Sequence, residues 1–205
     1  MSPWRRALDR EFGTISIDGT ILDIGGDSRS TYIQLLRGAH SVEIVNLDPA
    51  TGAKHLFDVE NPFPLADNAY DAVLCINLLE HIYNYKAFLA ECRRVMKEDG
   101  SLVLAVPFLM QVHPSPHDHF RYTEESLRRI FEEAGFRNIR VLPVGRGPFT
   151  AASHVTHNVL AKIPFLARAH AAVSGFFDSA LALFDTKGTF GPTRYPLGYL
   201  VRAGK

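Results

Sequence analysis

The chain has 205 residues, which favours one domain over two, because domains usually contain about 100 to 200 residues. Hydrophobic residues make up 46% and charged residues 21%, a composition that excludes collagen-like and wholly disordered chains. The 22 basic residues balance the 22 acidic ones, so no broad positive field exists and we expect no nucleic-acid partner.

The two cysteines, Cys75 and Cys92, fall in a predicted buried strand and a predicted helix and form no CxxC pair. Basic residues near the start are not followed by the apolar segment of a signal peptide. No later stretch is apolar enough to predict a transmembrane segment. These features predict a cytoplasmic protein with reduced cysteines.

Apolar runs of about five residues alternate with longer amphipathic stretches, a pattern typical of βαβ units around a parallel sheet. Residues 20–24 form the first predicted strand, and two glycines close it. An apolar stripe over residues 29–37 predicts a helix capped by Ser28 or Ser30. The chain therefore begins its core with a strand, a glycine turn and a helix.

The second predicted strand covers residues 42–47 and stops at Asp48-Pro49, because proline cannot donate to the ladder. The later elements follow the same pattern and are, in chain order, a strand over 71–76, a helix ending at Lys97 before Asp99-Gly100, a strand over 101–106, a helix over 123–135, a strand over 136–144 and a last strand over 197–202. The fold class that we predict is α/β, with a doubly wound, mostly parallel seven-stranded sheet.

Two segments depart from the alternation. Residues 111–123 are polar and rich in histidine, and a long irregular segment of this kind is typical of a binding loop or lid. Residues 151–184 are rich in alanine and strongly apolar, with two helical pieces separated near Pro164. We therefore expect a single domain over 1–205, with a core of about 18–145 and 195–205 and a helical cap insertion of about 150–186 before the last strand.

The insertion could roof a substrate pocket, form the face of a homodimer or contact a membrane surface peripherally. Charged residues and Pro164 interrupt the apolar pattern, so we expect no membrane-spanning segment here. We favour a pocket roof or a dimer face over a membrane contact.

Polar residues cluster where the predicted parallel strands end, and ligands of such sheets bind at these ends. An acid after the second strand, Asp48, can accept both hydroxyls of a ribose, although it could also be a simple turn residue. The turn Gly25-Gly26-Asp27 lacks the third glycine of a dinucleotide fingerprint, and the Asp27 carboxylate would repel a pyrophosphate but not a cation. The pattern predicts a nucleoside-containing ligand other than NAD.

Several stretches together resemble the Rossmann-like S-adenosylmethionine-dependent methyltransferases, in particular their small-molecule branch known as type 11. The resemblance covers roughly residues 20–145 and is carried by residues 21–26 (ILDIGG), 46–49 (NLDP), 57–59 (FDV), 63–73 (FPLADNAYDAV), 77–81 (NLLEH) and 93–100 (RRVMKEDG). It implies a seven-stranded Rossmann-like fold and S-adenosyl-L-methionine as cofactor. One departure is Asp27, which stands where the family usually has a glycine.

The resemblance also implies roles for individual residues. Cofactor contacts are expected for Asp23, Gly25 and Gly26 at the methionyl part, Asp48 and Pro49 at the ribose, Asp58 and Val59 at the adenine, and Asn77 on the sulfonium side. His81 is implied to lie close to the transferring methyl group. Glu80 is expected to be only a helix-start charge.

The histidine-rich loop supplies the other candidate catalytic residues, His113 and His117. A neutral imidazole near the acceptor could take a proton from a hydroxyl as the methyl group transfers. Structural contacts within the lid are the alternative, and Arg121 and Tyr122 are expected to pin the loop. His113, His117, Asp118 and His119 could also hold a metal, but their spacing fits no compact ligand template, so we expect none.

The resulting hypothesis is a methyltransferase that transfers a methyl group from S-adenosyl-L-methionine to a small-molecule acceptor, at oxygen. The alternative is a catalytically inactive relative that keeps the fold as a binding or regulatory subunit.

Overall fold

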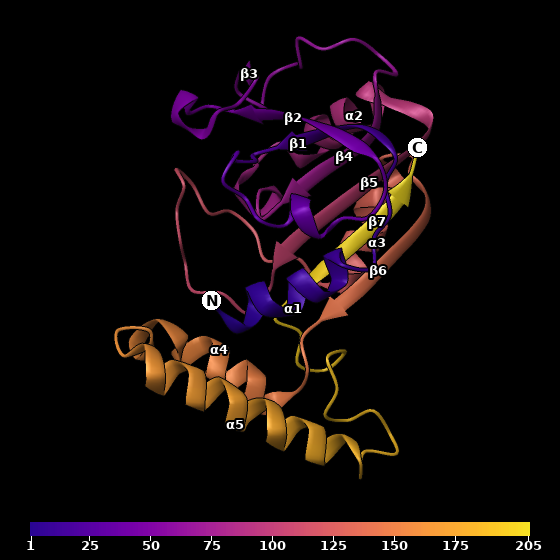
Figure 1. Cartoon of the computed structure of the whole chain (residues 1–205). Coiled ribbons are helices and arrows are strands. Elements are labelled where there is room, and N and C mark those ends of the chain that lie inside the picture. The colour runs from indigo at the N-terminus through magenta and orange to yellow at the C-terminus, as the bar shows by residue number, and fades with distance from the viewer.

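The computed structural model describes residues 1–205 and contains one seven-stranded sheet with the strand order β3-β2-β1-β4-β5-β7-β6 (Figure 1). The elements are, in chain order, α1 (Pro3–Phe12), β1 (Gly19–Ile24), η1 (Ile33–Leu35), β2 (His40–Asn46), η2 (Pro49–Thr51), β3 (His55–Leu56), β4 (Tyr70–Ile76), η3 (Leu79–His81), α2 (Tyr85–Val95), β5 (Met96–Pro107), α3 (Glu124–Glu133), β6 (Arg137–Val144), α4 (Pro148–Leu160), α5 (Pro164–Ala182) and β7 (Gly198–Gly204).

Five strands, β3 to β5 in spatial order, pair in parallel, and β7 lies antiparallel between β5 and β6. The chain moves outward from β1 to β2 and β3 and then returns to place β4 on the other side of β1. The order of strands therefore reverses between β1 and β4, and ligands of open α/β sheets bind at the carboxyl ends of strands at this point. The predicted α/β fold with seven strands is confirmed.

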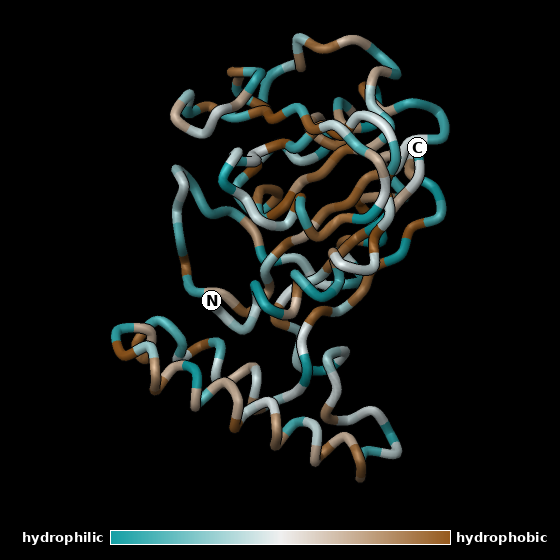
Figure 2. Tube along the Cα trace, viewed as in Figure 1, coloured by the Kyte–Doolittle hydropathy of each residue, from teal (hydrophilic) through white to brown (hydrophobic).

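Alternate residues of each strand fill two hydrophobic clusters, one on each face of the sheet. Leu22 and Ile24 of β1 belong to the cluster that includes buried residues of α2 and α3, whereas Ile21 belongs to the one that includes α1. Figure 2 shows the apolar strands enclosed between these layers. Cys75 and Cys92 are fully buried in the first cluster, are not paired in a disulfide, and burial raises the pKa of both thiols.

The prediction of a helix over residues 29–37 was wrong, because only the single 3-10 turn η1 forms there. Hydrogen bonds at the start of this segment hold it in a turn. Ser28 N donates to the carbonyl of Thr51 at 2.9 Å, and Arg29 N donates to Asp27 Oδ1 at 2.8 Å. A short polar side chain that binds a nearby amide stabilises a turn at the expense of a helix.

The boundary between α2 and β5 also differs from the prediction. The helix ends at Val95, and Met96 is extended and fully buried as the first residue of β5. Asp99 and Gly100 therefore lie within the strand instead of ending a helix. A Cβ at Gly100 would come within 2.8 Å of the carbonyl oxygen of Lys97, so this glycine permits a tight backbone approach.

Helix α1 was not predicted from the sequence. Ser2 caps it by accepting from Arg5 N at 3.2 Å, and Pro3 occupies its first turn, where a missing amide hydrogen has no effect. It buries Trp4, Leu8 and Phe12. This helix covers the sheet face opposite α2 and α3.

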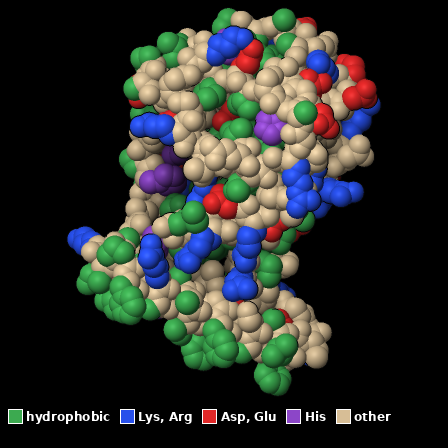
Figure 3. Space-filling view, in the orientation of Figure 1, with side chains coloured by type: hydrophobic (Ala, Val, Ile, Leu, Met, Phe, Trp, Pro, Cys, Tyr) green, Lys and Arg blue, Asp and Glu red, His purple; other side chains and the backbone are tan.

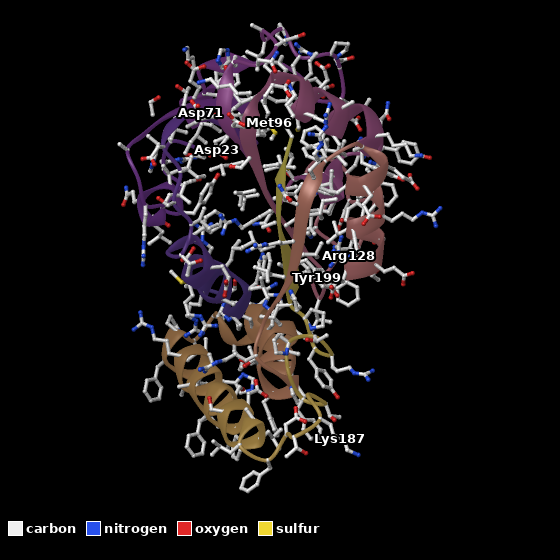
Figure 4. All side chains as sticks on the ribbon, turned by 90° about the vertical axis from the view of Figure 1, so that its right-hand side faces the viewer. Asp23, Asp71, Met96, Arg128, Lys187 and Tyr199 are labelled. Atoms are coloured by element: carbon white, nitrogen blue, oxygen red, sulfur yellow. The ribbon has the colours of Figure 1, made fainter.

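The predicted helical insertion forms the α4–α5 hairpin, residues 148–182, which Figure 1 shows standing off the sheet beside α1. None of the helices combines the length and the apolar character that crossing a bilayer would require. Figure 4 shows aromatic side chains projecting from the hairpin away from the sheet, with Asp23 inside the core.

Candidate active site

A cleft of about 210 Å³ opens at the carboxyl ends of β1, β2 and β4, where the strand order reverses. Four of the expected site residues line it, namely Gly25, Val59, Asn77 and His81. The other lining residues are mainly apolar and comprise Val45, Asn46, Leu47, Phe57, Leu78 and Ser115. Half of the ten lining residues are hydrophobic, and a cleft that combines apolar walls with convergent polar groups is typical of a small-molecule site.

The glycine turn forms one wall of the cleft. Gly25 has φ +77°, a left-handed conformation that glycine adopts without strain, and its amide donates to the carbonyl of Val45 at 2.8 Å. The carbonyl of Gly26 accepts from Asn46 Nδ2 at 2.8 Å. The turn is thereby fixed to the end of β2.

Asp23 lies under this turn and is completely buried. Its Oδ2 accepts from the Tyr32 hydroxyl at 2.7 Å, while its Oδ1 has no hydrogen-bond partner. A Cβ at Gly26 would come within 2.1 Å of Asp23 Oδ2, so only glycine fits above the carboxyl. Burial raises the pKa of Asp23 to about 7, despite the opposing effect of the Tyr32 hydrogen bond.

Asp27, which departs from the family pattern, is paired with Arg29. Arg29 Nε donates to Asp27 Oδ1 at 2.9 Å, and the guanidinium also binds the other carboxylate oxygen. Hydrogen bonds from Arg29 lower the pKa of Asp27 to about 2. The charge at this position is therefore compensated within the turn itself.

The two acids expected at the ribose and the adenine flank the cleft instead of lining it. Asp48 is exposed, precedes Pro49 and caps η2 by accepting from Ala50 N at 2.8 Å. Asp58 is also exposed and accepts from Glu60 N at 3.0 Å. Each lies directly beside a lining residue in the chain, Leu47 in the first case and Phe57 and Val59 in the second.

Asn77 is held in place by contacts to α1 and β5. It has φ +52°, and its Oδ1 accepts from the indole Nε1 of Trp4 at 3.0 Å. Its amide donates to the carbonyl of Ala105 in β5 at 2.8 Å. Trp4 of α1 thus orients a side chain of the cleft, a role that no local sequence signal indicates across 73 residues.

The histidine-rich loop is pinned by Asp118 and Arg121, as predicted for the arginine. Arg121 Nη2 donates to Asp118 Oδ2 at 2.8 Å, and the same oxygen accepts from His113 N at 2.8 Å. The Arg121 guanidinium holds the pKa of Asp118 well below its usual range. Tyr122 is buried in the hydrophobic core and anchors the end of the loop.

The loop brings His113 against His81, with ring centroids 5.1 Å apart, and leaves the ring of His117 exposed. The expectation that Glu80 is a simple helix-start charge was wrong. Glu80 is completely buried in η3, neither carboxyl oxygen has a hydrogen-bond partner, and burial raises its pKa to about 8. The Nε2 atoms of His81 and His113 lie 3.7 and 3.9 Å from Glu80 Oε1.

A second and larger cavity, about 430 Å³, lies between α4, the segment after β5 and the start of α1. Its lining residues are Ser2, Leu109, Met110, Gln111, His154, Val155, His157 and Asn158. His154 is buried, both of its ring nitrogens lack a partner, and burial lowers its pKa. The sequence did not identify His154 as a candidate site residue, because its burial depends on where α4 packs.

The comparisons with known proteins identify the family. A family described as a methyltransferase domain matches residues 2–141, so the chain belongs to this methyltransferase family. A probable S-adenosylmethionine-dependent methyltransferase of Mycobacterium tuberculosis is 28% identical over 91 residues, 42% of this chain and 33% of the relative. An uncharacterised protein of Methanocaldococcus jannaschii is 51% identical over 43 residues, 21% of this chain and 19% of that protein. The aligned regions thus span a third or less of these curated relatives.

Solved structures share the fold. A phosphoethanolamine N-methyltransferase of Haemonchus contortus, in complex with S-adenosyl-L-methionine, aligns with 100% of this chain and 53% of its own at 15% identity and a TM-score of 0.60. Identity at this level shows the Rossmann-like methyltransferase fold alone.

Proposed function

We propose that the protein transfers a methyl group from S-adenosyl-L-methionine to a small-molecule acceptor. The observation that carries the proposal is the cleft at the strand-order reversal, lined by Gly25, Val59, Asn77 and His81. Membership of the methyltransferase family supports it. When bound, the cofactor supplies an electrophilic methyl group, and the protein has to align the acceptor and exclude water.

The residues present fit this cofactor. The unpartnered oxygen of Asp23 suits the amino group of the methionyl part, and the lack of a Cβ at Gly26 lets this carboxyl lie directly against the turn. Gly25 and Gly26 would allow close approach, Asp48 and Pro49 would hold the ribose, and Asn77 would line the sulfonium side. Asp58 with Val59 would contact the adenine. The Asp27–Arg29 pair leaves the turn without an uncompensated charge.

Isothermal titration calorimetry with S-adenosyl-L-methionine tests this proposal. We expect binding by the wild type and at least a tenfold loss in Asp48→Ala, because the ribose hydroxyls lose their acceptor. Glu125→Ala, which removes an exposed carboxylate on α3, is the matched control. The absence of binding by the wild type would refute the function and favour the inactive relative, while unchanged binding by Asp48→Ala would refute only the ribose assignment.

We propose the 430 Å³ cavity as the acceptor pocket and oxygen as the methylated atom. Trp4 relates the two sites, because it hydrogen-bonds to Asn77 of the cofactor cleft and lies two residues after Ser2, which lines this cavity. His81, His113 and His117 stay candidate proton acceptors, and His154 joins them as a buried neutral imidazole. Tritiated methyl transfer to a phenol, and not to the matching aniline, would support oxygen; the reverse result would refute it.

The exposed side chains of the α4–α5 hairpin indicate the kind of surface that the protein meets. Its buried side chains are small or polar and include Ser153, Ser174 and Asp178, whereas its exposed ones include Phe165, Phe176 and Phe184 at 77%, 69% and 82% exposure. Several large apolar side chains exposed on one element mark it as a candidate interaction site. Figure 3 shows hydrophobic side chains along the outer edge of the hairpin and Lys and Arg side chains between it and the core.

We propose that this face lies on an anionic lipid surface. Arg6, Arg10 and Arg146 line a crevice of about 120 Å³ between α1 and the hairpin, so a basic border accompanies the phenylalanines. Basic residues beside an apolar helix face favour anionic headgroups, whereas a homodimer face needs no such border. In this proposal residues 1–205 form one cytoplasmic domain, consistent with reduced Cys75 and Cys92.

Vesicle flotation with and without phosphatidylglycerol tests the lipid contact. We expect the wild type to float with the anionic vesicles and the double variant Phe165→Ser/Phe176→Ser to lose this binding. Leu56→Ser, at an exposed apolar residue of β3, is the control. A concentration-dependent dimer in analytical ultracentrifugation, together with no flotation, would overturn the lipid proposal and identify the face as a subunit interface.

A further inference from the structure

Three electron-pair donors converge at the base of the histidine-rich loop. Glu80 Oε1, His81 Nε2 and His113 Nε2 lie within 4.8 Å of one another, with the two nitrogens 3.7 and 3.9 Å from the oxygen. These separations are too long for hydrogen bonds. The Glu80 carboxyl, 0% exposed, accepts no hydrogen bond on either oxygen, which is an expensive arrangement for a buried polar group.

The other nitrogen of each imidazole is already engaged. His81 Nδ1 contacts the backbone carbonyl of His117, and His113 Nδ1 lies 3.0 Å from the carbonyl of Gln111. A carbonyl only accepts, so the ring hydrogen resides on Nδ1 in both residues. Asp118 Oδ2, 3.4 Å from His113 Nδ1, favours the same tautomer. Both Nε2 atoms therefore carry a free lone pair, and they lie 3.7 and 3.9 Å from Glu80 Oε1.

A histidine that ligates a metal commonly donates its other ring nitrogen to a carbonyl or carboxylate, which fixes the ring and its tautomer. Both histidines here have that arrangement. Ligands around a tetrahedral Zn²⁺ lie about 2.0–2.2 Å from the ion and hence ~3.4 Å from one another, so a small inward movement of the rings would close the present spacing.

We propose that Glu80, His81 and His113 form a binding site for one divalent transition-metal ion of the zinc type. Two imidazoles and a carboxylate suit Zn²⁺, Co²⁺ or Fe²⁺ better than Mg²⁺ or Ca²⁺, which prefer all-oxygen ligands. The site differs from the set considered in the sequence, because Glu80 and His81 replace His117, Asp118 and His119. Because His113 belongs to the loop and Glu80 and His81 to η3, a bound ion fastens the loop to the wall of the cleft.

In this site the lone pairs of His81 and His113 bind the ion. Neither histidine can then accept a proton from the methyl acceptor. His154, in the acceptor cavity, is unaffected. The metal site changes which histidines can accept a proton in the proposed methyl transfer, but it is tested without an activity measurement.

Metal-stripped protein is titrated with Zn²⁺ by calorimetry and with Co²⁺ by visible absorption. We expect one ion per chain, a Co²⁺ d–d spectrum and a rise in Tm on binding, since a ligand that binds only the folded state stabilises it. Glu80→Gln and His113→Ala should each weaken binding at least a hundredfold. His119→Ala, which removes an exposed imidazole of the same loop, is the control and should bind as the wild type.

Glutamine has nearly the same size as glutamate, and the Glu80 side chain makes no hydrogen bond that the substitution could remove. The Glu80→Gln variant should therefore remain folded. Circular dichroism checks that it does, and His113→Ala provides an independent variant of a half-buried residue. Absence of stoichiometric binding by the wild type would overturn the site. Binding that persists unchanged in both variants would also overturn it, and loss in His119→Ala alone would assign the ion to the exposed histidines.

Discussion

Asp23 is a buried acid that makes the stability of the fold depend on pH. Its carboxyl is fully buried, with Tyr32 as its sole hydrogen-bond partner, and its pKa is raised from 3.8 to about 7. The folded state therefore retains a proton that the unfolded state has already lost between about pH 4 and 7. Stability falls as pH rises through this window, because the unfolded state binds fewer protons. A cationic ligand that pairs with the ionised form would reverse the preference.

Asp23→Asn should remove this dependence on pH. We expect wild type and variant to be similarly stable near pH 4 and the variant to be the more stable one above pH 7, by at most ~4 kcal/mol, since one pKa unit corresponds to about 1.4 kcal/mol. Urea denaturation across the window measures the difference. The control is Glu125→Gln, at an exposed carboxylate. Parallel curves for wild type and Asp23→Asn would contradict the assignment of the titration to Asp23.

The sequence could predict those site residues whose role is local. Gly25 follows β1 directly, Asp23 lies one residue before the end of that strand, and the turn after it depends on the backbone of the glycines and on nearby atoms. Glu80 and Trp4 could not be predicted, because burial of Glu80 depends on the loop folding over η3, and Trp4 reaches Asn77 across 73 residues. Tertiary contacts of this length leave no signal in spacing or composition.

At the scale of elements, α3 shows which helices a sequence specifies well. Thr123 accepts from Ser126 N at 3.2 Å, and Ser126 Oγ accepts from Thr123 N at 2.9 Å, a reciprocal capping box. These signals are all local to the segment. The structure confirms the helix predicted over 123–135 as α3. The helix predicted over 29–37 had an apolar stripe as well, but its first amides bind Thr51 and Asp27.

Thr123→Ala should destabilise the protein by about 1 kcal/mol through loss of the cap on α3. Thr123→Ser, which retains a hydroxyl at the same place, should recover most of this loss. The free energy of unfolding from urea titration measures both. Equal destabilisation by the two substitutions would show that the methyl group of Thr123, and not its oxygen, is responsible.

At the scale of the molecule, one buried carboxylate connects the two helices of the hairpin. Asp178 of α5 accepts from Phe149 N at 3.0 Å and from Thr150 N at 2.7 Å, both at the amino end of α4. An anion at this end also interacts favourably with the helix dipole. Packing within the hairpin is otherwise made by small residues, so these bonds carry much of its order.

Asp178→Ala should therefore loosen the hairpin while the sheet stays intact. We expect hydrogen exchange of the α4 and α5 amides to accelerate at least tenfold, because each lost charge-assisted bond is worth about 1.5–3 kcal/mol. Amides of β4 and β5 should be unaffected and serve as the internal reference. A uniform acceleration across sheet and hairpin would show instead that the hairpin and the core unfold together.

The burial of Cys75 and Cys92 has a practical consequence for work on this chain. Both thiols are fully enclosed and have raised pKa values, so at neutral pH they should resist maleimide reagents. A single cysteine introduced at Leu183, which is 82% exposed beyond α5, would then be the only reactive thiol. An environment-sensitive fluorophore attached there could report changes around the hairpin in real time. Cys75 and Cys92 would not have to be replaced for this measurement.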